Sequence, residues 1–211
     1  MIRVNNLTKK FRNNTIIENI SITFKQGNIY GLYGRNGSGK SVFLKLLCGL
    51  IKPTSGEIYY NDELLKNDIY KYSVGALIER PYFFDDLTGF ENLKVLAEIN
   101  KKINDNDILK ALEIVNLLEE KDKKYKKYSL GMCQKLGIAQ AIMENPNIII
   151  LDECFNGIEN ATVEKIKKYL ISEKEKGKII IISSHIKEDL LDLTNTIYYF
   201  DAGKIENSDE K

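Results

Sequence analysis

One short stretch of the sequence combines glycines, a lysine and a hydroxyl residue at a spacing suited to phosphate chemistry. It fits the pattern G-x-x-x-x-G-K-[ST] at every fixed position and reads Gly34-Arg35-Asn36-Gly37-Ser38-Gly39-Lys40-Ser41. Only a glycine-rich backbone can curl closely enough around a polyphosphate to point several N–H groups at it. Lys40 then supplies a positive charge for the β- and γ-phosphates, and the Ser41 hydroxyl is placed to bind Mg²⁺. The stretch therefore predicts a phosphate-binding loop.

The segments on either side of this loop decide whether the match is meaningful. An apolar run of strand length, residues 29–33, precedes the loop, and apolar residues at helical spacing follow it, beginning at Val42. The motif requires this order of strand, loop and helix, because the start of the helix must point at the bound anion. The alternative is an ordinary turn rich in glycine and serine, which the matched positions and both flanks disfavour.

Two carboxylates close a second apolar run. Residues 148–151 are all apolar, and Asp152 and Glu153 follow directly. A strand that is buried on both faces carries Asp152 to its carboxyl end, where oxygen ligands can hold Mg²⁺ directly or through water. Glu153 then stands one residue nearer the phosphates. Paired acids after a strand also occur as helix caps, but beside a phosphate-binding loop this pair is expected to form the second half of a nucleoside triphosphate site.

The single histidine of the chain follows a third apolar run. His185 comes after the four isoleucines 179–182 and two serines. A lone histidine is usually a structural residue. This one stands at the carboxyl end of an expected parallel strand, which is the edge where open α/β sheets bind ligands. We therefore favour a functional role for His185.

Composition restricts the partners and the compartment. The chain of 211 residues is long enough for one domain with a core, or for a core and a subdomain. Its 31 basic and 30 acidic residues leave a net charge of +1, so we expect no nucleic-acid partner. The three cysteines, Cys48, Cys133 and Cys154, are odd in number and far apart, which favours a reducing compartment. No apolar run approaches the roughly 18 residues of a membrane span, and no apolar signal segment opens the chain, so we expect a soluble protein.

The remaining pattern predicts an α/β fold with a P-loop NTPase core and a mainly parallel sheet. Alternating apolar residues at 20–24, together with residues 2–4, indicate an antiparallel β layer at the amino terminus. Helical spacing from Phe90 to about Leu118, with a candidate cap at Asn104, and again after Met132 indicates an inserted helical subdomain.

We expect one domain over residues 1–211. The β layer and the core occupy residues 1–85 and 145–211, and the helical subdomain occupies about 86–144. The carboxyl end predicts a hairpin over residues 197–205 and a frayed tail over 207–211.

Three features remain ambiguous at the level of the residues. Phe11 is placed in the core by its local pattern, but it could also stack on a nucleotide base. The aromatic loop at residues 82–89, which follows Glu79, Arg80 and Pro81, could be a docking surface or could fold back onto the core. The charged run 119–127 is typical of a solvated segment, and a nucleic-acid role is a weaker reading.

The order of these motifs resembles that of the ATP-binding cassette (ABC) ATPases along essentially the whole chain. The segment 128–132, with Ser129, Leu130, Gly131 and Met132, is similar to the signature motif of that family, and residues 156–159 occupy the place of its D-loop. The resemblance assigns Phe11 to stacking on adenine, which reverses the local preference for the core. It implies an ATP site made of Phe11, Gly34, Arg35, Asn36, Gly37, Ser38, Gly39, Lys40, Ser41 and Val42.

The resemblance also implies a mechanism. In the family, a helix that begins near Ser129 offers unpaired N–H groups to the γ-phosphate held by a partner's loop. Two chains then sandwich two ATP molecules head to tail, so a homodimer is expected. The roles it implies are Lys40 on the phosphates, Ser41, Asp152 and Glu79 at Mg²⁺, Glu153 as the base that activates water, and His185 on the γ-phosphate.

Five positions depart from the usual family pattern. Glu79 stands where most members have glutamine, and Leu130 and Met132 replace a glycine and a glutamine of the signature motif. These three changes resemble the branch that exports, or confers immunity to, peptide antibiotics such as lantibiotics and bacitracin. Glu159 replaces the usual D-loop aspartate and Cys154 the usual proline, changes that concern the coupling of the two sites rather than nucleotide binding.

The resemblance implies an ATPase subunit that drives a separate membrane permease, with export of a peptide or antibiotic-like substrate. The permease is expected to contact the loop after Glu79, which places the chain in the cytoplasm at the inner face of the membrane. Two alternatives are a soluble ABC ATPase that acts on ribosomes or DNA, and a nucleotide switch that hydrolyses ATP weakly. The first usually carries paired cassettes, a coiled-coil insertion or basic tails, and none is evident in this sequence.

Overall fold

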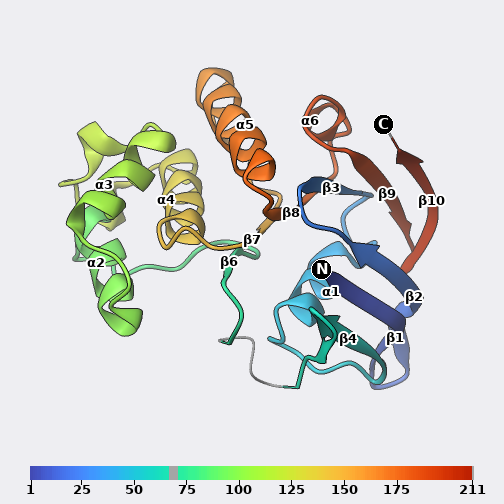
Figure 1. Cartoon of the computed structure of the whole chain (residues 1–211). Helices are drawn as coiled ribbons and strands as arrows, with labels where there is room; N and C mark the ends of the chain where they lie inside the picture. Colours follow the sequence, from blue (N-terminus) through green and yellow to red (C-terminus); the bar gives the residue numbers. More distant parts are fainter. Residues whose placement is uncertain (67–70, 211) are drawn as a thin grey trace.

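The computed structural model describes residues 1–66 and 71–210 (Figure 1). Its strands are β1 (Ile2–Phe11), β2 (Asn14–Phe24), β3 (Asn28–Tyr33), β4 (Ser55–Tyr60), β5 (Glu63–Leu64), β6 (Val74–Leu77), β7 (Ile148–Asp152), β8 (Ile179–Ser184), β9 (Thr196–Asp201) and β10 (Lys204–Glu210). Its helices are α1 (Lys40–Leu47), α2 (Gly89–Asn100), α3 (Asp105–Ile114), α4 (Leu130–Ile142), α5 (Asn160–Glu175) and α6 (Glu188–Leu191), with short 3-10 helices η2 (Leu118–Glu120) and η3 (Tyr125–Lys127).

The amino-terminal strands form the expected antiparallel sheet, in the order β2-β1-β4-β5. Phe24 pairs with Ile2, and Ile22 pairs with Val4. Phe24 and Ile22 are both buried, as the alternation predicted. The first strand is longer than its apolar residues indicated, because pairing continues to Phe11. Lysines in this extension point partly to solvent, which an antiparallel sheet with one solvated face tolerates.

The central sheet has the order β10-β9-β3-β8-β7-β6 and is parallel apart from β10, so the predicted fold class is confirmed. Every residue of β7 and β8 is buried, as their unbroken apolar runs predicted. The prediction of a frayed carboxyl end is wrong for residues 207–210. They continue β10, which pairs with β9 as far as Glu210 and Thr196, and Lys211 lies outside the described residues.

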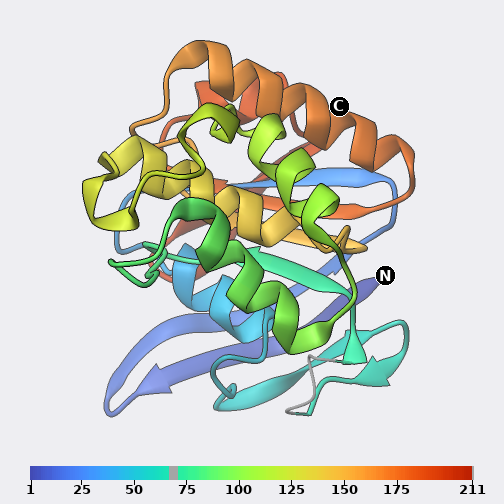
Figure 2. The same cartoon turned by 90° about the vertical axis from the view of Figure 1, so that its left-hand side faces the viewer.

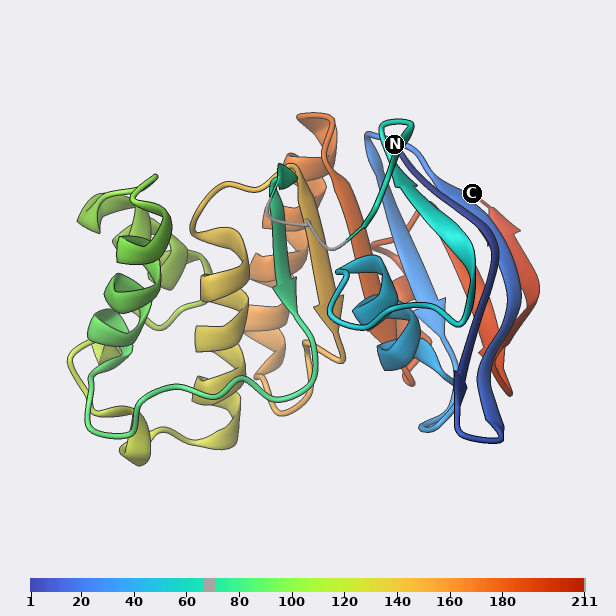
Figure 3. The ribbon, with the colours of Figure 1, turned by 90° about the horizontal axis from the view of Figure 1, so that it is seen from below.

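The two faces of the central sheet are covered by different layers (Figure 3). Ile148, Ile150 and Ile181 belong to the core shared with α1 and the antiparallel sheet. Ile149 and Ile182 belong to the second core, to which α4 and α5 contribute, and α2 and α3 pack outside α4 (Figure 2). Successive residues of each strand thus serve opposite cores, because side chains alternate across a sheet.

The α-helices between β6 and β7 begin at side-chain caps. Thr88 and Glu91 form a capping box at α2, and Asn104 caps α3 as its sequence position predicted. Ser129 caps α4 by accepting a hydrogen bond from the Met132 N–H at 3.2 Å. None of the described helices has the length and apolar character needed to cross a bilayer.

Candidate functional site

The phosphate-binding loop connects β3 to α1, and two of its glycines are required by its shape. A Cβ atom at Gly34 would lie 2.3 Å from the Phe200 carbonyl oxygen and 2.8 Å from Ser38 Oγ, so no larger residue fits. Gly39, at φ 107°, occupies the left-handed region directly before Lys40 begins α1. The predicted strand, loop and helix are therefore present in the predicted order.

The substitution Gly34→Ala is expected to lower the affinity for ATP by about tenfold or more, since one lost charge-assisted hydrogen bond from a displaced loop already costs about that much. Gly177→Ala is the control for an added methyl group, because no atom lies within 4 Å of its Cβ; its φ of 87° adds a backbone strain that is not found at Gly34. It should lose about 1–2 kcal/mol of stability through backbone strain and keep its ATP affinity. Titration with a fluorescent ATP analogue separates the two; equal affinities would contradict the steric argument.

Lys40 is buried at the base of the loop. Its Nζ donates to the carbonyl oxygens of Gly34 at 2.5 Å and Arg35 at 3.2 Å, and it lies 3.5 Å from Glu153 Oε1. The side chain is only 5% exposed. The positive charge is therefore fixed beside the backbone of the loop and faces the carboxylate that follows β7.

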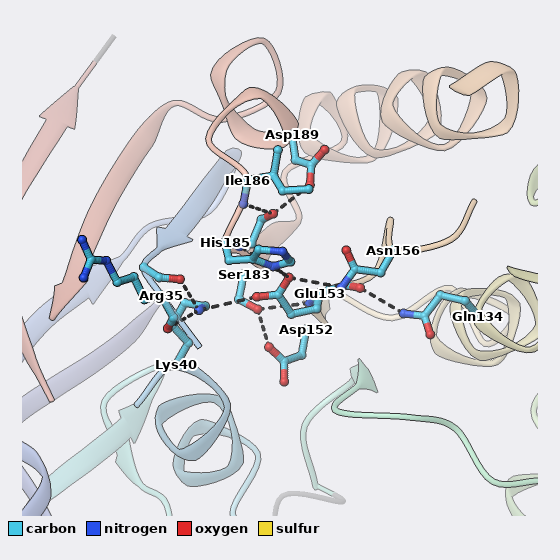
Figure 4. A network of polar contacts seen from close by, with 12 residues as sticks. Arg35, Lys40, Gln134, Asp152, Glu153, Asn156, Ser183, His185, Ile186 and Asp189 are labelled. Atoms are coloured by element: carbon cyan, nitrogen blue, oxygen red, sulfur yellow. Dashed lines mark hydrogen bonds and ion pairs between the residues drawn. The ribbon is translucent and has the colours of Figure 1, made fainter. Parts of the chain in front are cut away.

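Glu153 stands in an uncommon backbone conformation directly after β7. Its φ of 48° lies in the left-handed region, and its N–H donates to the carbonyl oxygen of Ser183 at 3.1 Å and to Ser183 Oγ at 3.2 Å. Its Oε2 lies 2.6 Å from His185 Nδ1, while Oε1 faces Lys40 (Figure 4). Strained backbone of this kind is typical of functional positions. The carboxylate is thus held between a lysine and a histidine, at the edge the sequence predicted.

Asp152 and Ser41 offer oxygen atoms suited to a hard cation. Asp152 is 3% exposed, and its Oδ1 accepts a hydrogen bond from Ser183 Oγ. Ser41 lies in the first turn of α1. Among the described residues no three His, Cys, Asp or Glu side chains gather as a metal cage. Mg²⁺ fits such a set, because it commonly takes one or two protein oxygens and completes its shell with phosphate oxygens and water.

Glu79, the other predicted metal ligand, has an ion pair of its own. Its carboxylate lies 2.5 Å from Lys45 Nζ, four residues after Ser41 on α1, and its side chain is 60% exposed. Its φ of 63° is again left-handed. Glu79 is therefore held at the end of α1 by a counter-charge that the sequence did not point to, and its role toward Mg²⁺ stays a prediction.

A hollow of about 380 Å³ brings together Phe11, Ile16, residues 36–42 and Glu153. Phe11 is 47% exposed, so the local expectation that it belongs to the core is wrong. Lys9 Nζ lies 4.7 Å from the centre of its ring and donates to the Lys52 carbonyl oxygen at 2.7 Å. An exposed aromatic ring at the rim of a phosphate site suits stacking on a base, and that role also stays a prediction.

The signature-like segment does not line this hollow. Ser129 and Leu130 are exposed, Leu130 to 57%, at the amino-terminal end of α4. The structure thus brings together the phosphate-binding loop, Asp152, Glu153 and His185, and leaves Ser129 and Gly131 on another surface of the same chain.

Sequence reasoning missed several contacts that hold this site. Ser183 bonds both Asp152 and Glu153, and its place at the end of an apolar run was the only available signal. Gln134 of α4 donates to the Glu153 carbonyl oxygen at 3.2 Å (Figure 4). Asp189 accepts from Ser184 Oγ at 2.7 Å. Neither Gln134 nor Asp189 belongs to a motif, so only the fold reveals them.

Three features together define an ATP-binding cassette. They are the phosphate-binding loop, the buried aspartate and adjacent glutamate at the end of β7, and the inserted helical segment whose last helix, α4, is capped by Ser129. The family model described as ABC transporter matches residues 17–156. The chain belongs to the ABC transporter family and is an ATP-binding subunit that hydrolyses ATP.

Relatives match the chain over nearly its whole length. An uncharacterised ABC transporter ATP-binding protein, YybJ of Bacillus subtilis, is 45% identical over all of this chain and 97% of its own length. The bacitracin transport ATP-binding protein BcrA of Enterococcus faecalis is 39% identical over 97% of this chain and 68% of its own length. The lantibiotic transport ATP-binding protein SrtF of Streptococcus pyogenes is 34% identical over 97% of this chain and 89% of its own.

The fold is also that of solved cassettes. The dimeric structure of MJ0796, a bacterial ABC transporter cassette, superimposes with a TM-score of 0.91 at 26% identity and covers all of this chain and 98% of that one.

Proposed function

We propose that this ATP-binding subunit powers the export of a peptide antibiotic through a separate membrane permease, at the inner face of the membrane. The observation that carries the proposal is the match, over almost the whole chain, to bacitracin and lantibiotic transport ATPases. The ATP site described above supplies the energy source. Glu79, with its counter-ion Lys45, is the acidic replacement that the resemblance linked to this branch.

A second copy of the chain completes each ATP site. Ser129 and Gly131 lie outside the hollow lined by the phosphate-binding loop, and the amino-terminal end of α4 carries N–H groups and a positive dipole end suited to a phosphate. The similarity to a cassette solved as a dimer supports the same arrangement. Two loops and two signature segments then face each other across a two-fold axis.

Within the completed site each of these residues has a separate role in ATP hydrolysis. Lys40 and the loop amides stabilise the charge on the phosphates. Glu153 accepts a hydrogen bond from, or the proton of, the attacking water. His185 keeps its predicted contact with the γ-phosphate and also orients the Glu153 carboxylate through the 2.6 Å contact with Oε2. Ser41 and Asp152, with Glu79, would hold Mg²⁺, which supplies further charge neutralisation when bound.

The permease is expected to bind a groove at the free edge of the central sheet. The groove, of about 520 Å³, lies along β6 and is lined by apolar residues of α2 and α4 and by Leu50 and Pro81. Leu50 and Ile99 are 63% and 73% exposed, an unusual degree for large apolar side chains. We assign the groove to an intracellular segment of the permease because it adjoins the aromatic loop after Pro81, in which Tyr82 and Phe84 are 92% and 64% exposed.

Ile99→Asp is expected to reduce copurification with the permease by about tenfold or more, because a buried unpaired carboxylate at an interface costs several kcal/mol. Basal ATP hydrolysis should not change. Val95→Asp is the matched control, since Val95 is 42% exposed on the same helix but does not line the groove. If the two variants copurify with the permease equally well, the groove is not the docking site.

The function itself is tested in the organism of origin. Deletion of the gene should raise susceptibility to bacitracin or to a lantibiotic, and the wild-type gene, but not Glu153→Gln, should restore resistance. The neighbouring reading frame should encode a membrane protein with several spans that copurifies with this chain. Unchanged susceptibility together with copurification on ribosomes would favour the non-transport alternative. ATP turnover that stays negligible even with the permease would favour the nucleotide switch.

A further inference from the structure

The first two turns of α4 lie against the segment 153–159 of the same chain at three positions. A Cβ atom at Gly131 would stand 2.2 Å from the Gly157 carbonyl oxygen, so the two backbones are in direct contact. Gln134 Nε2 donates to the Glu153 carbonyl oxygen at 3.2 Å, and Lys135 Nζ lies 2.8 Å from Glu159 Oε1. Positions 131, 134 and 135 share one helical face. That face therefore follows the whole segment from the catalytic carboxylate to the start of α5.

The ion pair at the far end of this contact is well defined. The Lys135 side chain is 8% exposed, and its Nζ also donates to the Asn116 carbonyl oxygen at 3.3 Å. Glu159 Oε1 accepts a second hydrogen bond, from Thr162 Oγ1 at 2.9 Å. The Lys135 ammonium, with these hydrogen bonds, lowers the pKa of Glu159 to about 2, so its carboxylate stays ionised at neutral pH. Lys135 is thus a fixed partner of Glu159, whose side chain is longer than that of the aspartate usual at this position.

Neither Gln134 nor Lys135 lines the nucleotide hollow, so their contacts serve something other than direct binding of ATP. One end of the α4 face carries Ser129 and Gly131, which meet the partner's nucleotide in the proposed dimer. The other side of the same face holds the backbone of Glu153, whose carboxylate works on the nucleotide of its own chain. The two ATP sites of a dimer are therefore joined within each chain by a few short contacts.

We propose that Gln134 and Lys135 are positioning residues that couple the two ATP sites. They tie the helix that carries the signature segment to the segment that begins with Glu153. Docking of α4 on the partner's nucleotide then sets the position of Glu153 in its own site. This proposal rests on the head-to-tail dimer of the proposed function and adds the residues through which one site acts on the other.

The test compares three lysine variants of the full chain. Lys135→Met removes the ammonium and keeps the length of the side chain, and Lys135→Arg keeps the charge. Lys165→Met is the matched control, because the hydrogen bond from Lys165 Nζ to the Glu113 carbonyl oxygen at 2.6 Å joins α5 to α3 and does not join α4 to the segment 153–159. For each variant we would measure ATP affinity of the monomer, ATP turnover against ATP concentration, and the melting temperature.

Lys135→Met should keep the monomer's ATP affinity, lose about fivefold or more in turnover, and show a Hill coefficient near 1 where the wild type approaches about 2. Lys135→Arg and Lys165→Met should both behave like the wild type in the Hill coefficient. A Lys135→Met protein with a lower melting temperature but unchanged cooperativity and turnover would overturn the proposal and leave a purely structural ion pair.

Two further outcomes are separated by the same measurements. If Lys135→Met does not fold, Glu159→Gln tests the pair from its exposed side, with the same loss of cooperativity expected and unchanged cooperativity overturning the proposal. If the wild type itself neither dimerises with ATP nor responds cooperatively, the proposed dimer fails, and the coupling proposal fails with it. If ATP turnover is cooperative both in the wild type and in Lys135→Met, the coupling proposal fails while the proposed dimer stands.

Discussion

Glu153→Gln is expected to bind ATP like the wild type and to lose about 1000-fold in turnover, the range of a lost general base. The amide keeps the size of the side chain but cannot take a proton from water. It also removes the negative charge that lies 3.5 Å from Lys40, so the lysine is left free for the phosphates and ATP binding should not weaken. Without hydrolysis the ATP-bound dimer should persist.

The measurements are a phosphate-release assay and size-exclusion chromatography with ATP. The variant should elute as a dimer with ATP and as a monomer without it. Glu98→Gln, an exposed residue of α2, is the control and should hydrolyse ATP at the wild-type rate. Wild-type turnover by Glu153→Gln would assign the activation of water to another group.

Gly131→Ala is expected to leave ATP binding by the monomer intact and to reduce turnover by about 100-fold, the cost of displacing catalytic groups by about 1 Å. The added methyl group would stand 2.2 Å from the Gly157 carbonyl oxygen, a distance that real atoms do not adopt, so the two backbones must separate. That separation moves the signature segment and the Glu153 to Glu159 segment relative to each other.

Gly177→Ala again serves as the comparison, since it carries backbone strain without a collision. A Gly131→Ala variant with normal turnover, at a melting temperature close to that of the wild type, would show that the helix and the D-loop adjust to each other freely. The α4 contact would then have no role in the chemistry.

The sequence predicted those parts of the site that depend on local pattern. The phosphate-binding loop was predictable because its tight backbone requires glycines at fixed positions. Asp152 and Glu153 were predictable because they follow directly on a run of apolar residues. The carboxyl ends of parallel strands meet at one edge of a sheet, so His185 could be expected near Glu153, where the structure has it 2.6 Å away.

Contacts between segments far apart in the chain could not be predicted. The pairs Lys45–Glu79 and Lys135–Glu159 join residues that have no common motif, and either lysine could equally have been a solvated surface charge. The extension of β10 to Glu210 was missed for a related reason. Its polar residues lack an apolar alternation, and their order comes from pairing with β9.

The aromatic loop shows how one segment can satisfy two opposite expectations. Phe83 packs against the Tyr125 ring with centroids 5.3 Å apart, so part of the loop folds back onto the core. Tyr82 and Phe84 stay exposed and follow Pro81, which lines the groove beside β6, so the rest remains available for docking. Neighbouring residues on an extended segment point to opposite sides, and composition alone does not say which side is covered.

The central claim is that one chain holds only half of each ATP site, and complementation between two inactive variants tests it most directly. Glu153→Gln chains, which keep the signature segment, are mixed with an equal amount of Ser129→Arg chains before ATP is added. The arginine blocks the signature segment but leaves the Gly131–Gly157 contact and Glu153 in place. Half of the dimers are then mixed, and each mixed dimer has one complete site, so up to about a quarter of wild-type turnover should return. A mixture no more active than the two separate variants would contradict the shared site.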